Sequence, residues 1–400
     1  MNRVFLNPKR LGLFLIITLF LLGSRSLPEV NPGEVGLAAN QLNRLENLLK
    51  AAIEARTIPG AVICVGRKGK IAYWRAFGWS QLVPFKKKMT REMIFDLASL
   101  TKPIATATSV MILVEQGKLR LKDKVKKYIP EFRKYQGEEG AGEEALIWHL
   151  LTHTSGLPPY AQVEKIEKLY GRPCQLEEMV EYIARLEELA PPGQEFRYSC
   201  LGFISLAYIV EKVSGEKLAD FAQRHIFQPL GMTRTFFRPS REMKSQCVPT
   251  EKLPTGLLQG VVHDPLARLL GGVSGNAGLF SSAGDLALFA QMMLNQGCLN
   301  GVRILSPLSV RRLTEVYPAV SFSGRGLGWD INSSYASPRG DLFSLGSYGH
   351  TGYTGTSLWI DPETQSFVIL LTNRVHPEDK GSVTSLRSRV ANVVAAAILD

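Results

Sequence analysis

A serine and a lysine stand three positions apart at the start of a long apolar stretch, "FDLASLTKPIATATSVMILVEQG" (95–117). At helical spacing Ser99 and Lys102 share one face, with Cβ atoms about 5–6 Å apart. A serine hydroxyl is a weak nucleophile until a neighbouring group takes its proton. The apolar flanks would desolvate the lysine amine and lower its pKa toward neutrality. The spacing is therefore typical of a nucleophile, Ser99, activated by Lys102.

The same spacing has a structural alternative, which is a helix-capping serine followed by a lysine whose amine reaches solvent. The chain contains a second pair of this kind, Ser214 and Lys217 in "VSGEKL". That pair includes Gly215 and follows an apolar helical pattern, so we interpret it as a helix C-terminal turn. Spacing alone does not distinguish chemistry from capping.

Hydrophobic periodicity predicts the elements that must position the pair. Residues 37–56 have the period of an amphipathic helix, and 58–78 read as two strands around "RKGK". Residues 349–374 form a second predicted hairpin around "DPETQ", and 386–399 a closing helix. Helical patterns fill the interval. The sequence predicts an α+β fold, in which an antiparallel sheet from both chain ends is flanked by helices and carries an inserted helical lobe.

The N-terminus has the pattern of an export signal. Three basic residues precede the apolar run 11–23, and small residues follow it. The run is shorter than the ~20 residues of a spanning helix. We expect a signal peptide at 1–26, with an uncleaved anchor as the alternative. Residues 27–400 are then one catalytic domain, with an α/β lobe at about 35–98 and 300–400 and a helical lobe at about 103–295.

Composition excludes several other classes of protein. The net charge of +11 falls to +7 without the four basic residues of 1–26, and the basic runs carry no interleaved aromatics. We expect no nucleic-acid partner, although the surplus charge could attract an anionic cell envelope. The five cysteines are an odd, widely spaced set without metal-ligand spacing, so neither a metal nor another cofactor is expected. The sequence is silent on oligomeric state.

Three short motifs occur in one order: "SLTK" (99–102), "YSC" (198–200) and "HTG" (350–352). They resemble the S-x-x-K, Y-x-N and K/H-T-G motifs of serine β-lactamases and penicillin-binding proteins. The resemblance covers about residues 35–400 and is closest to the class C-related branch, which includes exported cell-wall amidases, peptidases and esterases. It implies the β-lactamase/transpeptidase-like fold.

The resemblance also implies roles. Ser99 attacks a carbonyl and becomes the acyl-enzyme, while Lys102 and Tyr198 share the proton transfers. Which of the two is the base stays open. His350 orients Tyr198 or contacts a substrate carboxylate.

Further roles follow from the strand that carries the third motif. Thr351 and Gly352 line the site, and a side chain at 352 would block close approach of the substrate. The backbone N–H groups of Ser99 and Tyr353 form the oxyanion hole.

Two residues depart from the family pattern. Cys200 replaces the usual Asn, and a thiol is a weak hydrogen-bond partner, so contact with Lys102 and with the substrate's acyl side chain is in doubt. A nucleophilic Cys200 is the minor alternative. His350 replaces the lysine usual in β-lactamases, which argues against a dedicated β-lactamase because a neutral imidazole holds a carboxylate less firmly.

Other histidines are weaker candidates. His263, in "GVVHDPLARLLGG", resembles a phrase of cell-wall-recycling members and either lines the site or stabilises a loop. His149 and His153 are interpreted as structural rather than as metal ligands.

The expected function is an exported serine hydrolase that cleaves amide or ester bonds, with cell-wall peptides as substrates. We expect an amidase or a D-amino-acid-type peptidase first, then a short-chain carboxylesterase, then a weak β-lactamase. The alternative of another class is a penicillin-binding sensor or a catalytically impaired binding protein. The selecting loops carry no pattern that identifies the substrate.

Overall fold

The computed structural model describes residues 26–133, 135 and 144–400. The signal peptide predicted at 1–26 lies outside the described residues, apart from its last residue, Ser26. Within the described chain, no helix has both the length and the apolar character needed to cross a membrane.

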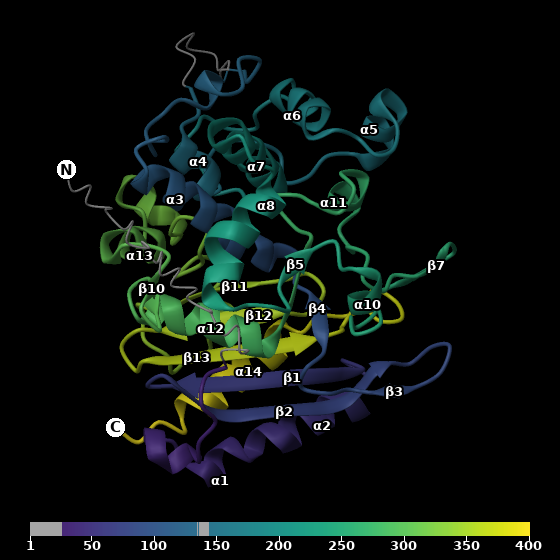
Figure 1. Cartoon of the computed structure of the whole chain (residues 1–400), viewed down its shortest axis with the longest axis vertical. Coiled ribbons are helices and arrows are strands. Elements are labelled where there is room, and N and C mark those ends of the chain that lie inside the picture. The colour runs from purple at the N-terminus through teal and green to yellow at the C-terminus, as the bar shows by residue number, and fades with distance from the viewer. Residues whose placement is uncertain (1–25, 134, 136–143) are drawn as a thin grey trace, which may run out of the picture.

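One antiparallel sheet is built from both ends of the chain (Figure 1). Its strand order is β11-β12-β13-β1-β2-β3. The central strands β1 and β13 pair from Ala61↔Thr372 to Arg67↔Ser366, so the N-terminal and C-terminal hairpins meet at the middle of the sheet. The predicted α+β fold is confirmed. The strands are β1 (Gly60–Arg67), β2 (Lys70–Gln81), β3 (Lys87–Lys88), β11 (Tyr348–Thr351), β12 (Ser357–Asp361) and β13 (Ser366–Thr372).

Both faces of the sheet are covered, which is why β1 is buried along its whole length. Alternate residues of β1 point to opposite faces. Ile63 and Val65 join the apolar cluster under α2 (Arg44–Glu54) and α14 (Thr384–Ala395), whereas Val62 and Cys64 join the main core. The helix α12 (Ala283–Leu294) contacts β1, β12 and β13 on that second face. Ser282 caps its N-terminus, because the Ser282 hydroxyl accepts the Asp285 N–H.

The helical lobe lies against the α12 side of the sheet and shares its core (Figure 1). At its centre is α7, which contacts α3, α4, α6 and α8. The helices of this half are α3 (Thr108–Glu115), α4 (Ile147–Leu151), α5 (Val163–Tyr170), α6 (Leu176–Ala184), α7 (Cys200–Ser214), α8 (Leu218–Ala222), α9 (Gln228–Leu230), α10 (Arg241–Lys244) and α11 (Pro265–Leu269), and α13 (Pro307–Thr314) follows α12.

Some elements differ from the sequence expectation. The helix predicted over 37–56 is divided at Asn43 into α1 (Ala39–Leu42) and α2. A second sheet of order β4-β8-β5 was not predicted, because strands this short show no clear alternation. The remaining strands are β4 (Ile94–Asp96), β5 (Phe236–Phe237), β6 (Lys252–Leu253), β7 (Gly256–Leu257), β8 (Leu279–Ser282), β9 (Cys298–Leu299) and β10 (Val302–Arg303).

Candidate active site

Ser99 and Lys102 lie at an irregular entry to α3 rather than on a regular α-helix. Ser99 sits in a single 3₁₀ turn (Ala98–Leu100), and Lys102 opens a π-helical turn (Lys102–Ala107) that continues into α3. Ala98 has a φ of 46°, in the left-handed region that is costly for a residue with a Cβ. The Asp96 carboxylate holds this conformation by accepting the Ala98 N–H at 2.9 Å. Strained backbone of this kind is often found beside functional side chains.

Lys102 is completely buried, and its amine has three acceptors. It donates to Ser99 Oγ at 2.9 Å, to the Asn276 carbonyl at 3.0 Å and to Cys200 Sγ at 3.5 Å. These contacts match the three donors of an ammonium group. The predicted contact with Ser99 is present, and the contact with position 200 is kept despite the thiol.

The pKa of Lys102 moves in the opposite direction from the sequence expectation. Burial on its own lowers the pKa of this amine, but the neighbouring Cys200 and Tyr198, when ionised, outweigh burial and raise it. With one of these neighbours ionised, Lys102 is an ammonium group that hydrogen-bonds Ser99. An ammonium has no lone pair with which to accept a proton, which favours Tyr198 as the base.

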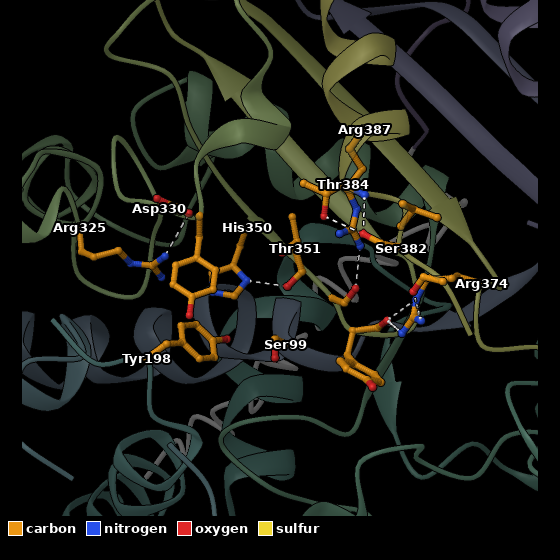
Figure 2. Close-up of a pocket in the computed structure, with 15 residues that line it drawn as sticks. Ser99, Tyr198, Arg325, Asp330, His350, Thr351, Arg374, Ser382, Thr384 and Arg387 are labelled. Atoms are coloured by element: carbon orange, nitrogen blue, oxygen red, sulfur yellow. Dashed lines mark hydrogen bonds and ion pairs between the residues drawn. The ribbon is translucent and has the colours of Figure 1, made fainter. Parts of the chain in front are cut away.

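Tyr198 lies beside the Ser99–Lys102 pair. The amine of Lys102 is 5.1 Å from the Tyr198 ring centroid, and Figure 2 shows the phenol oxygen directed toward Ser99. The ring stacks on His153 with centroids 4.3 Å apart. His153 also accepts the Ser199 N–H at Nδ1 (3.1 Å), so it fixes both the phenol and the start of α7. His153 is therefore a support for Tyr198, which agrees with its interpretation as structural.

His350, on β11, is buried beside Tyr198, with ring centroids 6.0 Å apart. Its Nδ1–H donates to the Thr351 carbonyl at 2.8 Å, and its Nε2 has no hydrogen-bond partner among the described residues. Burial lowers the pKa of His350 well below its usual value, and the nearby Arg325 and Lys102 charges lower it further. His350 is therefore a neutral imidazole.

Two buried arginines hold the backbone that follows β11. Arg387, on α14, donates to the Gly352 carbonyl at 2.7 Å, and Arg374 donates to the Tyr353 carbonyl at 2.7 Å. The Tyr353 N–H makes no hydrogen bond to any other described residue. It is thus free to donate to a developing oxyanion, as expected of an oxyanion-hole donor.

A side chain at Gly352 would also collide with the protein itself. A Cβ at this position would lie 2.1 Å from Thr356 Oγ1 and 2.3 Å from the Leu97 carbonyl oxygen. The collision is with the protein's own backbone, directly behind the turn that precedes Ser99. Gly352 therefore lets the segment after β11 pack against the segment that carries the serine.

These groups surround a cavity of about 340 Å³ (Figure 2). Its lining contains three arginines and a single carboxylate, Asp330. Arg374 and Arg325 are each paired with an acid, Asp379 and Asp330 respectively, whereas Arg387 has no carboxylate partner among the described residues. The cavity is therefore electropositive. Its lining residues are Ser99, Tyr198, Arg325, Asp330, Tyr335, His350, Thr351, Gly352, Tyr353, Arg374, Gly381, Ser382, Val383, Thr384 and Arg387.

Three predicted site residues do not line this cavity: Lys102, which lies beneath Ser99, Cys200 and His263. Cys200 lies behind it against Lys102, and burial raises the pKa of its thiol, against the lowering effect of the Lys102 charge. His263 lies behind Tyr353, with ring centroids 5.8 Å apart, and its Nε2 is 3.2 Å from Glu251. Its backbone N–H donates to Asp96, the residue that holds the turn before Ser99. This placement favours the loop-stabilising alternative for His263.

Several residues of the site were missed by sequence reasoning. Arg325, Arg374 and Arg387 are isolated arginines whose spacing carries no signal. Asn276, whose carbonyl accepts from Lys102, lies in the phrase "GNAGLF" near the small second sheet. That phrase was the one available signal. Within the described part of the chain, no group of three or more His, Cys, Asp and Glu side chains could hold a metal ion.

The site can now be compared with known proteins. The family model described as "Beta-lactamase" matches residues 45–392. An N-acetylmuramyl-L-alanine amidase of Bacillus subtilis (strain 168) is 32% identical over 387 residues, covering 88% of this chain and 87% of the relative. A putative D-alanyl-D-alanine carboxypeptidase of Escherichia coli (strain K12) is 31% identical over 378 residues, covering 88% and 86%.

Solved structures show the same fold. EstCE1, a hydrolase with promiscuous acyltransferase activity, has a TM-score of 0.72 at 25% identity, covering 89% of this chain and 99% of its own. The octameric penicillin-binding protein homologue from Pyrococcus abyssi has a TM-score of 0.68 at 26% identity, covering 89% and 77%. The chain belongs to the β-lactamase family and is a serine hydrolase of the β-lactamase type.

Proposed function

We propose that this protein is an exported amidase or D-amino-acid-type peptidase that forms an acyl-enzyme on Ser99 and cleaves amide bonds in peptidoglycan-derived peptides. The observation that carries the proposal is the 2.9 Å hydrogen bond from the buried Lys102 amine to Ser99 Oγ, at the wall of a cavity that Tyr198 also lines. A nucleophile beside its proton-transfer groups, open to a cavity, is the arrangement that acyl transfer requires.

In the proposed reaction Tyr198, as phenolate, takes the Ser99 proton while Oγ bonds to the substrate carbonyl carbon. The carbonyl π electrons move onto its oxygen, which the N–H groups of Ser99 and Tyr353 stabilise. Collapse of this intermediate breaks the C–N bond, and the Tyr198 hydroxyl returns the proton to the leaving amine. Water then repeats the sequence in place of the amine and releases the acid.

The charge of the cavity supports a peptide substrate that carries carboxylates. Arg387 is 8% exposed, has no acidic partner among the described residues, and leaves Nε without a hydrogen bond. A buried cation without a counter-ion is costly, and a bound carboxylate would remove that cost. Peptide stems of the cell wall carry such groups. The names of the amidase and carboxypeptidase relatives agree with this class of substrate.

The experiment combines active-site labelling with product analysis. A fluorophosphonate probe should label the mature protein, and Ser99→Ala should abolish the labelling. Ser214→Ala is the matched control because it removes the serine of the second S-x-x-K pair. The Ser214 hydroxyl donates to the Val210 carbonyl within α7. Labelling that survives Ser99→Ala contradicts the nucleophile assignment.

The products then separate the candidate substrates. Mass spectrometry of muropeptides after incubation should show loss of a stem peptide or of a terminal amino acid. Hydrolysis of p-nitrophenyl acetate without muropeptide cleavage favours the carboxylesterase alternative, which the similarity to EstCE1 supports. Labelling without turnover of any substrate favours a binding protein.

A further inference from the structure

The site holds a positive charge that the three sequence motifs do not supply. Position 350 carries a neutral imidazole, whose one ring N–H already donates to the Thr351 carbonyl. His350 therefore provides no cation near the phenol of Tyr198. Proton transfer from Ser99 to Tyr198 depends on stabilising the anionic phenolate, for which nearby cations are the usual device.

Arg325 is the second cation close to the ring of Tyr198. Its side chain is 1% exposed, and its guanidinium carbon is 5.9 Å from the Tyr198 ring centroid. The residue lines the same cavity as Ser99 and Tyr198, and Figure 2 shows its guanidinium extending toward the Tyr198–His350 pair. Together with Lys102, it is one of two cationic side chains in contact with the Tyr198 ring in the described chain.

The bonding of Arg325 is incomplete for a purely structural residue. Its Nη1 is 3.3 Å from Asp330 Oδ2, whereas Nε and Nη2 have no partner among the described residues. Asp330 in turn accepts two hydrogen bonds from Ser333 at Oδ1, so its charge is shared. A residue needed only to hold the Arg325–Asp330 turn would not require a buried charge with unsatisfied donors.

The other groups that face Tyr198 do not supply positive charge. His153 stacks on the ring at 4.3 Å and is buried, and burial with the Arg325 and Lys102 charges lowers its pKa well below the usual value. Tyr335 lies at 5.7 Å and His350 at 6.0 Å. The Cys200 thiol faces Lys102 rather than the phenol.

We propose that Arg325 is a positioning residue that acts through Tyr198, supplying from position 325 the positive charge that stabilises the phenolate as it takes the Ser99 proton. This inference rests on the proposed function. It predicts that a positive charge at position 350 can replace the one at position 325, because a lysine introduced at 350 would stand next to the same phenol.

The test measures kcat/KM for p-nitrophenyl acetate from pH 5 to 10. The acid limb is the part of this profile where kcat/KM rises with pH. In Arg325→Gln it should move to higher pH by about one unit, so that kcat/KM on that limb falls about tenfold and recovers at high pH. Combining Arg325→Gln with His350→Lys should move the limb back. Asp330→Asn should move it to lower pH, because the variant removes the negative charge that offsets Arg325.

These outcomes distinguish charge from structure. If Arg325 is only structural, Arg325→Gln and Asp330→Asn should both lose activity, by the same factor at every pH. His350→Lys should then not restore it. That result overturns the inference. If Arg325→Gln does not fold, as judged by its thermal transition, Arg325→Lys replaces it and must keep the acid limb, and Asp330→Asn alone still decides. Labelling that is independent of Ser99 would refute the proposed function itself. Ser99-dependent labelling, together with an acid limb that does not move in Arg325→Gln, refutes only the role of Arg325.

Discussion

The amine of Lys102 is fully buried and lies 2.9 Å from the hydroxyl of Ser99. The other two acceptors of this amine are the Asn276 carbonyl, three residues before β8, and the Cys200 thiol, at the first residue of α7. One side chain therefore ties together three segments that are remote in the chain.

Lys102→Met should lower the rate of fluorophosphonate labelling by about 10³-fold, because Ser99 loses the group that orients it and balances the Tyr198 charge. Thermal stability should change little, since an apolar group of similar size replaces a buried ion. Lys217→Met is the matched control, because Lys217 is exposed and pairs with Glu211 at the surface. The measurement is the rate of fluorophosphonate labelling of the two variants. A wild-type labelling rate for Lys102→Met would show that Lys102 takes no part in the mechanism.

Cys200→Ala should keep the labelling on Ser99, because the buried thiol lies behind the cavity and burial raises its pKa. Cys200→Asn should label faster than wild type, since an amide oxygen accepts from the Lys102 ammonium more strongly than sulfur does. Peptide mapping of the labelled protein identifies the modified residue. Loss of the label in Cys200→Ala, with its thermal transition unchanged, would instead support the nucleophilic alternative for Cys200.

The sequence predicted the parts of the site that depend on local spacing. Ser99 and Lys102 meet because they are three residues apart, and the second pair, Ser214 and Lys217, does end α7 with Gly215 in a left-handed conformation, as interpreted. Likewise, alternation and turn residues predicted β1, β2, β12 and β13, which are the four central strands of the sheet.

The sequence could not predict what depends on long-range packing. The direction of the Lys102 pKa is set by Cys200 and Tyr198, about 100 residues away in the chain. The three arginines reach the cavity from separate segments, and Gly352 is required by its contact with Leu97, which no local pattern encodes.

Arg387→Gln should slow labelling by about 10²-fold, because the Gly352 and Thr356 carbonyls lose their donor and the Tyr353 N–H shifts from the oxyanion position. The matched control is Arg389→Gln, two residues along α14, where the side chain is exposed. The comparison uses second-order labelling rates at equal ionic strength. Equal rates in the two variants would show that Arg387 does not organise the oxyanion hole.

Glu188 gives a prediction about stability rather than catalysis. This carboxyl lies in the loop after α6, both of its oxygens lack a hydrogen-bond partner among the described residues, and burial raises its pKa from 4.5 to about 8. The folded state therefore holds the proton more tightly than the unfolded chain does. The stability contributed by this group is fully present below pH 4.5 and is lost as the pH rises toward 8.

Glu188→Gln should remove this loss, so that its free energy of unfolding exceeds the wild-type value by ~1–3 kcal/mol at pH 8. Well below pH 4.5 the two proteins should be equally stable, because the wild-type carboxyl is then protonated in both states. Urea unfolding at the two pH values measures the difference. Glu187→Gln, at the exposed neighbouring position, should show no such dependence on pH. Parallel behaviour of Glu188→Gln and wild type would mean that the Glu188 carboxyl is ionised and solvated in the native protein.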